Sequence, residues 1–232
     1  SGQRPAAVIE VDAGLRRCGS ATPEQTVRLA RMLGENGIDY RGIMGYEGHM
    51  YGQPEDAARA ELIHTALATV NDHVEALAEA GLAPKIVSTS GTASVLIASK
   101  TAGVTELQAG TYVFNDSHNE EFIPGVFENA LTLLMTVISV KDRYAVGDAG
   151  AKSLTNEFGP PMSVDGTVKV ARLSEEHCTL TGEGIAKLKP GQRIEVVPSH
   201  GDTTLNQHDV YYVRRGEEVI DTWPILAARK FR

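Results

Sequence analysis

His200 and Asp202, separated by Gly201, combine two residue types that bind metal ions. The apolar run before them, residues 194–197, predicts a short strand, which ends at Pro198 because proline has no N–H to donate to a neighbouring strand. If the backbone stays extended through Gly201, both side chains point to the same face. An imidazole and a carboxylate on one face can hold a divalent cation and leave coordination positions open. The alternative is a histidine and an aspartate in a polar surface turn, and the spacing alone does not separate the two.

A second candidate site is the loop Ser-Thr-Ser-Gly-Thr-Ala-Ser at residues 88–94, between a predicted strand at 85–88 and a predicted helix at 92–102. Small residues let the backbone approach an anion, hydroxyls add donors, and a helix N-terminus adds N–H groups and partial positive charge. Gly110 and Thr111, at the end of the next predicted strand, could close the same phosphate cradle. A simple capped loop explains these residues equally well. No Walker-type lysine follows, so a nucleoside triphosphate is not expected.

The elements that must position these residues change character along the chain. Up to residue 116 strands and helices alternate, which implies parallel strands with helical crossovers. The predicted strands are 6–12, 38–44, 85–88 and 105–115, and the predicted helices begin near residues 22, 55 and 92. Beyond residue 118 the strand-like segments 131–140, 143–156, 167–173, 192–197, 209–214 and 218–223 are separated by turns and predict an antiparallel β-domain. We therefore expect two domains, residues 1–118 and 119–232.

Composition limits the classes of function. The 232 residues are 42% hydrophobic and carry a net charge of −8, which is ordinary globular composition and argues against nucleic acid or an acidic membrane as the main partner. No apolar run is long enough to span a bilayer. Cys18 and Cys178 form no CxxC pair, and we expect both to be buried thiols in a reducing cytoplasm.

Several segments resemble the alanine-racemase-like (fold-type III) pyridoxal-phosphate enzymes, and specifically their D-threonine aldolase and D-serine dehydratase branch. The matching segments are 11–19 (Val-Asp-Ala-Gly-Leu-Arg-Arg-Cys-Gly), 42–49, 88–94, 106–114, 174–177, and 200–202 with 209–213. Each segment alone is weakly specific, and the resemblance rests on their order over nearly the whole chain. It implies an α/β fold: the four C-terminal strands of a (β/α)8 barrel in residues 1–118, then an antiparallel β-domain that carries a metal site.

The resemblance assigns roles by position. Arg17 corresponds to the arginine near the phenolic oxygen of pyridoxal 5'-phosphate, and Tyr46 to the residue packed on the pyridine ring. Gln108 stands where alanine racemases carry an arginine that faces the pyridine nitrogen, and a neutral amide can donate or accept there. The residues implied to bind the phosphate are Ser90, Gly91, Thr92, Gly110, Thr111 and Tyr112. His200 and Asp202 correspond to the branch's metal ligands, and Tyr46 and His200 are the candidate catalytic residues.

The remaining histidines divide into two groups. His49 and His177 lie in family-like segments and are candidates for the same site. We expect the others on the surface of a helix or in loops: His64, His73, His118 and His208.

The resemblance implies a metal-dependent lyase, an aldolase that cleaves β-hydroxy-D-amino acids to glycine and an aldehyde and acts as a homodimer. In the resembling dehydratases a cysteine takes the place of Asp202. A carboxylate suits manganese or magnesium better than zinc, and so favours the aldolase. The alternatives are a D-serine or 3-hydroxy-D-aspartate dehydratase, an amino-acid racemase, and a non-catalytic cofactor-binding remnant. The family attaches its cofactor through a lysine on the first barrel strand, and no lysine here matches it. The chain also opens directly on a core-like strand, so we expect the N-terminal half of the barrel to lie outside this sequence.

Overall fold

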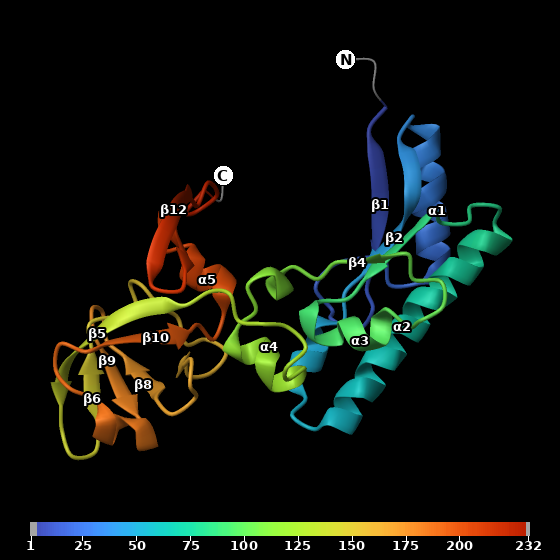
Figure 1. Cartoon of the computed structure of the whole chain (residues 1–232). Helices are drawn as coiled ribbons and strands as arrows, with labels where there is room; N and C mark the ends of the chain where they lie inside the picture. Colours follow the sequence, from blue (N-terminus) through green and yellow to red (C-terminus); the bar gives the residue numbers. More distant parts are fainter. Residues whose placement is uncertain (1–3, 231–232) are drawn as a thin grey trace. The chain divides into compact units, whose positions relative to one another are not determined.

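The chain divides into two compact units at the Gly110–Thr111 bond, in a computed structural model that describes residues 4–230 (Figure 1). The first unit holds parallel strands with helical crossovers and the second an antiparallel barrel, which confirms the predicted fold class. The domain boundary expected after residue 118 falls inside the short helix α4 (Ser117–Phe122) and stays a prediction.

Four parallel strands form the sheet of the first unit, in the order β1-β2-β3-β4. Its elements are β1 (Ala6–Val11), α1 (Pro23–Glu35), β2 (Asp39–Gly45), η1 (Gly48–Gly52), α2 (Asp56–Glu79), β3 (Ile86–Thr89), η2 (Thr92–Ser94), α3 (Val95–Ala98) and β4 (Glu106–Leu107). Ile9, Ile43 and Val87 pair across the three strands β1, β2 and β3 and are buried. Ala30 of α1 and Val70 of α2 belong to the same core cluster. This core holds the carboxyl ends of the strands at one edge, where the loops with the candidate residues begin.

Helix α1 begins where its sequence predicts. Thr22 is the N-cap and accepts a hydrogen bond from the N–H of Gln25 at 3.3 Å, and Pro23 occupies the first turn, where its missing N–H costs nothing. Gly37, at φ +74°, lies just beyond the helix in the left-handed region that favours glycine.

The surface position expected for His73 is wrong. The side chain is 1% exposed, and its Nδ1 lies 2.7 Å from the hydroxyl of Thr26, which in turn lies 2.5 Å from the hydroxyl of Ser20. The reason is helical periodicity: His73 lies three residues after Val70 and four before Leu77, on the apolar stripe of α2. Burial lowers the pKa of His73, so it stays neutral within this hydroxyl network.

The strand predicted at 105–115 is much shorter. Only Glu106–Leu107 pairs with β3, as an edge strand of the sheet, and the chain then enters the short helix η3 (Thr111–Val113). Asn115, with φ at +53°, ends the segment. The helix predicted at 92–102 is also shorter, because η2 and α3 together end at Ala98.

Six antiparallel strands of the second unit close into a barrel, in the order β10-β5-β6-β9-β8-β7, and β11 and β12 form a separate hairpin (Figure 1). After η3 and α4 the elements are β5 (Leu133–Val140), β6 (Ala145–Gly147), β7 (Met162–Ser163), β8 (Lys169–Leu173), β9 (Cys178–Thr181), η4 (Glu183–Lys187), β10 (Arg193–Val197), α5 (Gly201–Leu205), β11 (Val210–Arg215) and β12 (Glu218–Pro224). Met135, Val137, Leu154, Leu180 and Val196 fill the barrel core. Strand β10 leads out of this core directly to His200.

Three expectations about the second half need correction. The strand predicted at 143–156 ends at Gly147, because the chain turns at Gly150, whose Cα leaves no room for a Cβ against the backbone of Glu175. The extended backbone expected through Gly201 is replaced by the short helix α5. Cys178 is buried as expected, but Cys18 is exposed.

In the described residues 4–230, no helix is both long and apolar enough to cross a membrane.

Candidate functional site

Arg17 and Tyr46 meet at the strand ends of the first unit. The guanidinium carbon of Arg17 lies 5.7 Å from the centre of the Tyr46 ring, within range of a cation–π interaction. Arg17 also approaches the carboxylate of Glu10 at 3.5 Å. Burial raises the pKa of the Tyr46 phenol, the nearby Glu47 carboxylate raises it further, and Arg17 opposes both. Tyr46 is therefore a neutral aromatic surface beside a fixed positive charge.

Gly91 lies on the edge of the same tyrosine ring. A Cβ built at Gly91 would approach Tyr46 Cε2 to 3.0 Å, so the loop backbone and the ring are in close contact. The structure thus brings Arg17, Tyr46 and the 90–92 loop together, three elements that lie far apart in the sequence. His49 joins this edge as well, because a Cβ at Gly14 would lie 3.0 Å from its ring.

The buried carboxylate of Glu47 accepts hydrogen bonds from the 90–92 loop and from residues on either side of it. Glu47 is 1% exposed and accepts hydrogen bonds from the Thr89 hydroxyl at 3.1 Å, from the Ser90 N–H at 3.4 Å, and from the Ser94 hydroxyl. Ser90 has φ at +81°, a conformation that costs energy in a non-glycine residue. Glu47 therefore holds the loop in a shape that it would not take alone. Glu47 was not among the residues predicted for the site, although an acidic side chain two residues after a buried strand could have pointed to it.

Gln108 is held by a relay of hydrogen bonds. Its Nε2 donates to Ser88 Oγ at 3.0 Å, and Ser88 Oγ donates to the Glu106 carboxylate at 2.5 Å. Because the only hydroxyl proton of Ser88 goes to the carboxylate, Ser88 can only accept from the amide, which fixes the amide's orientation.

Gly110 closes the first unit, while Thr111 and Tyr112 open the second. In its own unit Tyr112 packs against Phe127, with ring centroids 5.5 Å apart. The part of Gly110, Thr111 and Tyr112 in a phosphate cradle stays a prediction.

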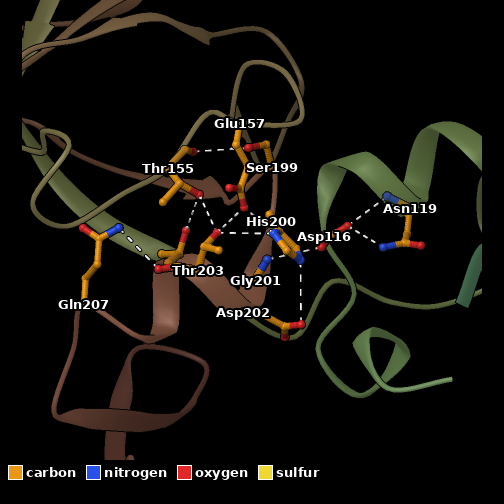
Figure 2. A network of polar contacts seen from close by, with 11 residues as sticks. Asp116, Asn119, Thr155, Glu157, Ser199, His200, Gly201, Asp202, Thr203 and Gln207 are labelled. Carbon is orange, nitrogen blue, oxygen red and sulfur yellow. Dashed lines mark hydrogen bonds and ion pairs between the residues drawn. The ribbon is translucent and has the colours of Figure 1, made fainter. Parts of the chain in front are cut away.

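His200 and Asp202 converge in the second unit (Figure 2). His200 Nε2 lies 3.7 Å from Asp202 Oδ2, and the other ring nitrogen, Nδ1, contacts the Glu157 carboxylate. Two donors that share one cation at ordinary bond lengths of about 2.1 Å lie about 3.0–3.5 Å apart. The observed pair is thus within a small side-chain movement of sharing an ion. Among residues 4–230, no group of three His, Cys, Asp or Glu side chains is arranged to hold a metal ion.

The turn that carries this pair is anchored by Asp116. This aspartate is fully buried; its Oδ2 accepts from the N–H of Gly201 at 3.2 Å, and its Oδ1 accepts from both the backbone and the side-chain amide of Asn119, at 2.8 and 2.9 Å. Asp116 thereby caps α4 and holds the first N–H of α5 at the same time (Figure 2). Neither α4 nor this anchor was predicted from the sequence, although an aspartate before a helical segment is a typical capping signal.

Aromatic rings line one side of His200. Phe158 lies 4.7 Å from His200 and stacks on His118 at the same centroid distance, 4.7 Å. Burial lowers the pKa of His118. The loop position expected for His118 is wrong, since it lies in α4, whereas His177 is exposed in the turn between β8 and β9.

The residues fit the groups that the sequence implies. The first unit offers a small-residue loop against an aromatic ring and an arginine, which suits a phosphorylated aromatic cofactor. The second offers a nitrogen and an oxygen donor with open positions, which suits a hard divalent cation.

A parallel sheet with helical crossovers followed by an antiparallel barrel is the architecture of the alanine racemase class. Residues 1–118 match the family "Alanine racemase, N-terminal domain", and the chain belongs to it. Residues 130–214 match the family "Putative serine dehydratase domain".

The chain is similar to three known aldolases. The chain is 34% identical over 234 residues to a 3-hydroxy-D-aspartate aldolase of Paracoccus denitrificans (strain Pd 1222), which covers 96% of this chain and 60% of the relative. It is 33% identical to a D-threonine aldolase of Arthrobacter sp, over 95% of this chain and 60% of the relative. The crystal structure of D-threonine aldolase from Filomicrobium marinum superimposes with a TM-score of 0.90 at 30% identity, over 98% of this chain and 64% of that one. The chain thus spans about 60% of the length of these curated relatives.

Proposed function

We propose that this chain is the C-terminal part of an aldolase that uses pyridoxal 5'-phosphate and a divalent metal to cleave β-hydroxy-D-amino acids, such as D-threonine, to glycine and an aldehyde. The observation that carries the proposal is the convergence of His200 Nε2 and Asp202 Oδ2 at 3.7 Å. It occurs in a chain whose relatives include two aldolases for β-hydroxy-D-amino acids.

The cofactor would be held by the strand-end loops. Tyr46 would pack against the pyridine ring, Arg17 would stand near the phenolic oxygen, and Gln108 would face the ring nitrogen through its fixed amide. The phosphate would be bound by Ser90, Gly91, Thr92, Gly110, Thr111 and Tyr112. Pyridoxal phosphate, when bound, supplies an electron sink for the negative charge that cleavage leaves on Cα. Tyr46 would act by orienting the ring, and its phenol is neutral at pH 7, as for an ordinary tyrosine.

The metal would be held by His200 and Asp202, with water and the substrate in the remaining positions. A bound cation supplies the charge that lowers the pKa of the substrate's β-hydroxyl, whose deprotonation drives C–C cleavage. The donor set contains no sulfur, which favours manganese or magnesium over zinc. Two protein ligands give modest affinity, so a chelator should strip the metal.

The lysine that bonds to the cofactor would lie on the N-terminal half of the barrel, outside this sequence. We infer that this chain has three partners. They are the N-terminal half of the barrel, a small β-hydroxy-D-amino acid as substrate, and a second copy of the protein. We place the protein in the cytoplasm, where the exposed thiol of Cys18 would stay reduced.

A dehydratase is the second candidate, favoured by the match of residues 130–214, which include His200 and Asp202, to a putative serine dehydratase domain. Incubation of the complete protein with D-threonine, pyridoxal phosphate and Mn²⁺ separates the candidates by product. An aldolase yields glycine and acetaldehyde, a dehydratase 2-oxobutanoate and ammonia, and a racemase, which inverts Cα alone, L-allo-threonine. A remnant yields no product and shows no absorbance in the Schiff-base band.

A further inference from the structure

Glu157 occupies the side of the His200 ring that faces away from Asp202. Its Oε1 contacts His200 Nδ1, while His200 Nε2 lies 3.7 Å from Asp202 Oδ2 (Figure 2). We propose that Glu157 is a positioning residue that fixes the tautomer and orientation of His200 and thereby sets the affinity of the metal site. The inference rests on the proposed function, because it presumes that His200 binds a metal.

The proton count of the ring supports this role. A neutral imidazole carries one N–H, and a carboxylate can only accept, so the proton belongs on Nδ1 when Glu157 is ionised. Nε2 then presents its lone pair on the side of Asp202, as a metal ligand must. Without the carboxylate, either nitrogen could carry the proton, and the tautomer with Nε2–H cannot bind a cation.

The carboxylate is itself held in place. The hydroxyl of Thr203 donates to Glu157 Oε1 at 2.6 Å and lies 3.3 Å from His200 Nδ1, so the three groups form a closed triangle. Thr155 Oγ1 lies 3.0 Å from Thr203 Oγ1 and continues the network into the loop before Glu157 (Figure 2). The Glu157 carboxylate is thus held by a network of hydrogen bonds and does not touch His200 alone.

Other contacts fix the same turn without Glu157. Asp116 holds the N–H of Gly201 at 3.2 Å, and Phe158 packs on the His200 ring at 4.7 Å. Loss of the Glu157 carboxylate should therefore leave the fold and the backbone of this turn intact. The loss removes the negative charge and the hydrogen-bond acceptor that Glu157 places beside His200 Nδ1. Such carboxylate partners of metal-bound histidines typically contribute about 10- to 100-fold in metal affinity.

The test uses the complete protein loaded with pyridoxal phosphate and titrated with Mn²⁺ by calorimetry. Glu157→Ala should weaken Mn²⁺ binding about 10- to 100-fold. Glu157→Gln, whose amide oxygen can still accept from Nδ1–H, should weaken it less. Glu217→Gln, at an exposed carboxylate in the β11–β12 turn, is the control for a lost negative charge and should bind as the parent does. Parent-like affinity in both Glu157 variants would overturn the inference, whereas a parent that binds no Mn²⁺ would overturn the proposed metal site instead.

A second readout needs no metal. ¹⁵N NMR of labelled histidine, assigned with His200→Asn, should show the Nδ1–H tautomer at His200 in the parent and in Glu157→Gln. It should show a shift toward Nε2–H in Glu157→Ala. A tautomer that is the same in the parent and in Glu157→Ala would contradict the positioning role even if metal affinity fell.

Discussion

His200 Nε2 and Asp202 Oδ2 lie 3.7 Å apart although the two residues do not share a strand. His200 keeps extended dihedral angles, φ −140° and ψ 116°, and the chain turns into α5 at Gly201. The helical turn brings Asp202 back beside the imidazole ring. Asp116 accepts a hydrogen bond from the N–H of Gly201 in this turn, and Glu157 contacts the other ring nitrogen, Nδ1. This convergence is the basis of the proposed metal chemistry.

Asp202 itself gives the most selective test of that chemistry. Its side chain is 73% exposed, so Asp202→Ala should not reduce stability. In the complete protein we expect this variant to keep the cofactor's absorbance and to lose most metal-dependent cleavage, since one of two protein ligands is gone. Asp202→Cys should shift the preference toward zinc, because a thiolate is the softer ligand. Full activity of Asp202→Ala in the presence of chelator would exclude the pair as the metal site.

Gly91 tests the contact between the 90–92 loop and Tyr46. A Cβ at this position would lie 3.0 Å from Tyr46 Cε2, so Gly91→Ala must displace the ring or the loop by a few tenths of an ångström. We expect weaker binding of pyridoxal phosphate, measured by cofactor absorbance after dialysis. Gly52→Ala is the matched control, because a Cβ there meets nothing within 4 Å. Equal cofactor retention in the two variants would show that the loop and ring do not form the cofactor site.

Glu47 should matter for stability as well as for the loop. Glu47→Ala leaves three buried donors, from Thr89, Ser90 and Ser94, without their acceptor. Each such donor costs about 1–3 kcal/mol when unpaired, so we expect a loss of about 2–4 kcal/mol in the free energy of unfolding after relaxation. Glu47→Gln keeps one acceptor oxygen and should lose less. Urea unfolding measures both, and a loss below about 1 kcal/mol for the alanine variant would mean that the loop is held by other contacts.

Tyr40 gives a prediction about pH. Its hydroxyl is buried without a hydrogen-bond partner in the described part of the chain, and burial raises the pKa of Tyr40 to about 12. Since the folded pKa lies above the unfolded one, the phenol ionises first in the unfolded state, so the free energy of unfolding falls as the pH rises from about 10 toward 12. Tyr40→Phe should be neutral or slightly stabilising at pH 7 and should flatten the loss of stability between pH 10 and 12. A clear destabilisation at pH 7 would show that the hydroxyl has a partner.

The first unit could be predicted well because its elements follow strong periodic patterns. The cap at Thr22 and the apolar stripe of α2 place both long helices to within a residue or two. The second unit was harder to predict, because strands such as β7, with two residues, carry no periodicity and form only through long-range pairing. The strand predicted beyond Leu107 failed for a related reason, since residues at an edge gain few ladder bonds.

The residues of the candidate site were likewise only partly predictable from the sequence. His200 and Asp202 could be named because their residue types and spacing carry chemistry on their own, although the extended geometry first expected for them was wrong. Glu157 could not be named, because 43 residues separate it from His200 and it lies in an irregular loop. Supporting residues of this kind depend on tertiary contacts, and no local pattern marks them.

The products that the complete protein forms from D-threonine, with and without metal, test the proposed aldolase activity most directly. Glycine and acetaldehyde should appear in equal amounts, disappear after treatment with chelator, and return when Mn²⁺ is added back, with pyridoxal phosphate bound throughout. Formation of 2-oxobutanoate and ammonia, or cleavage that persists undiminished in chelator, would contradict the account.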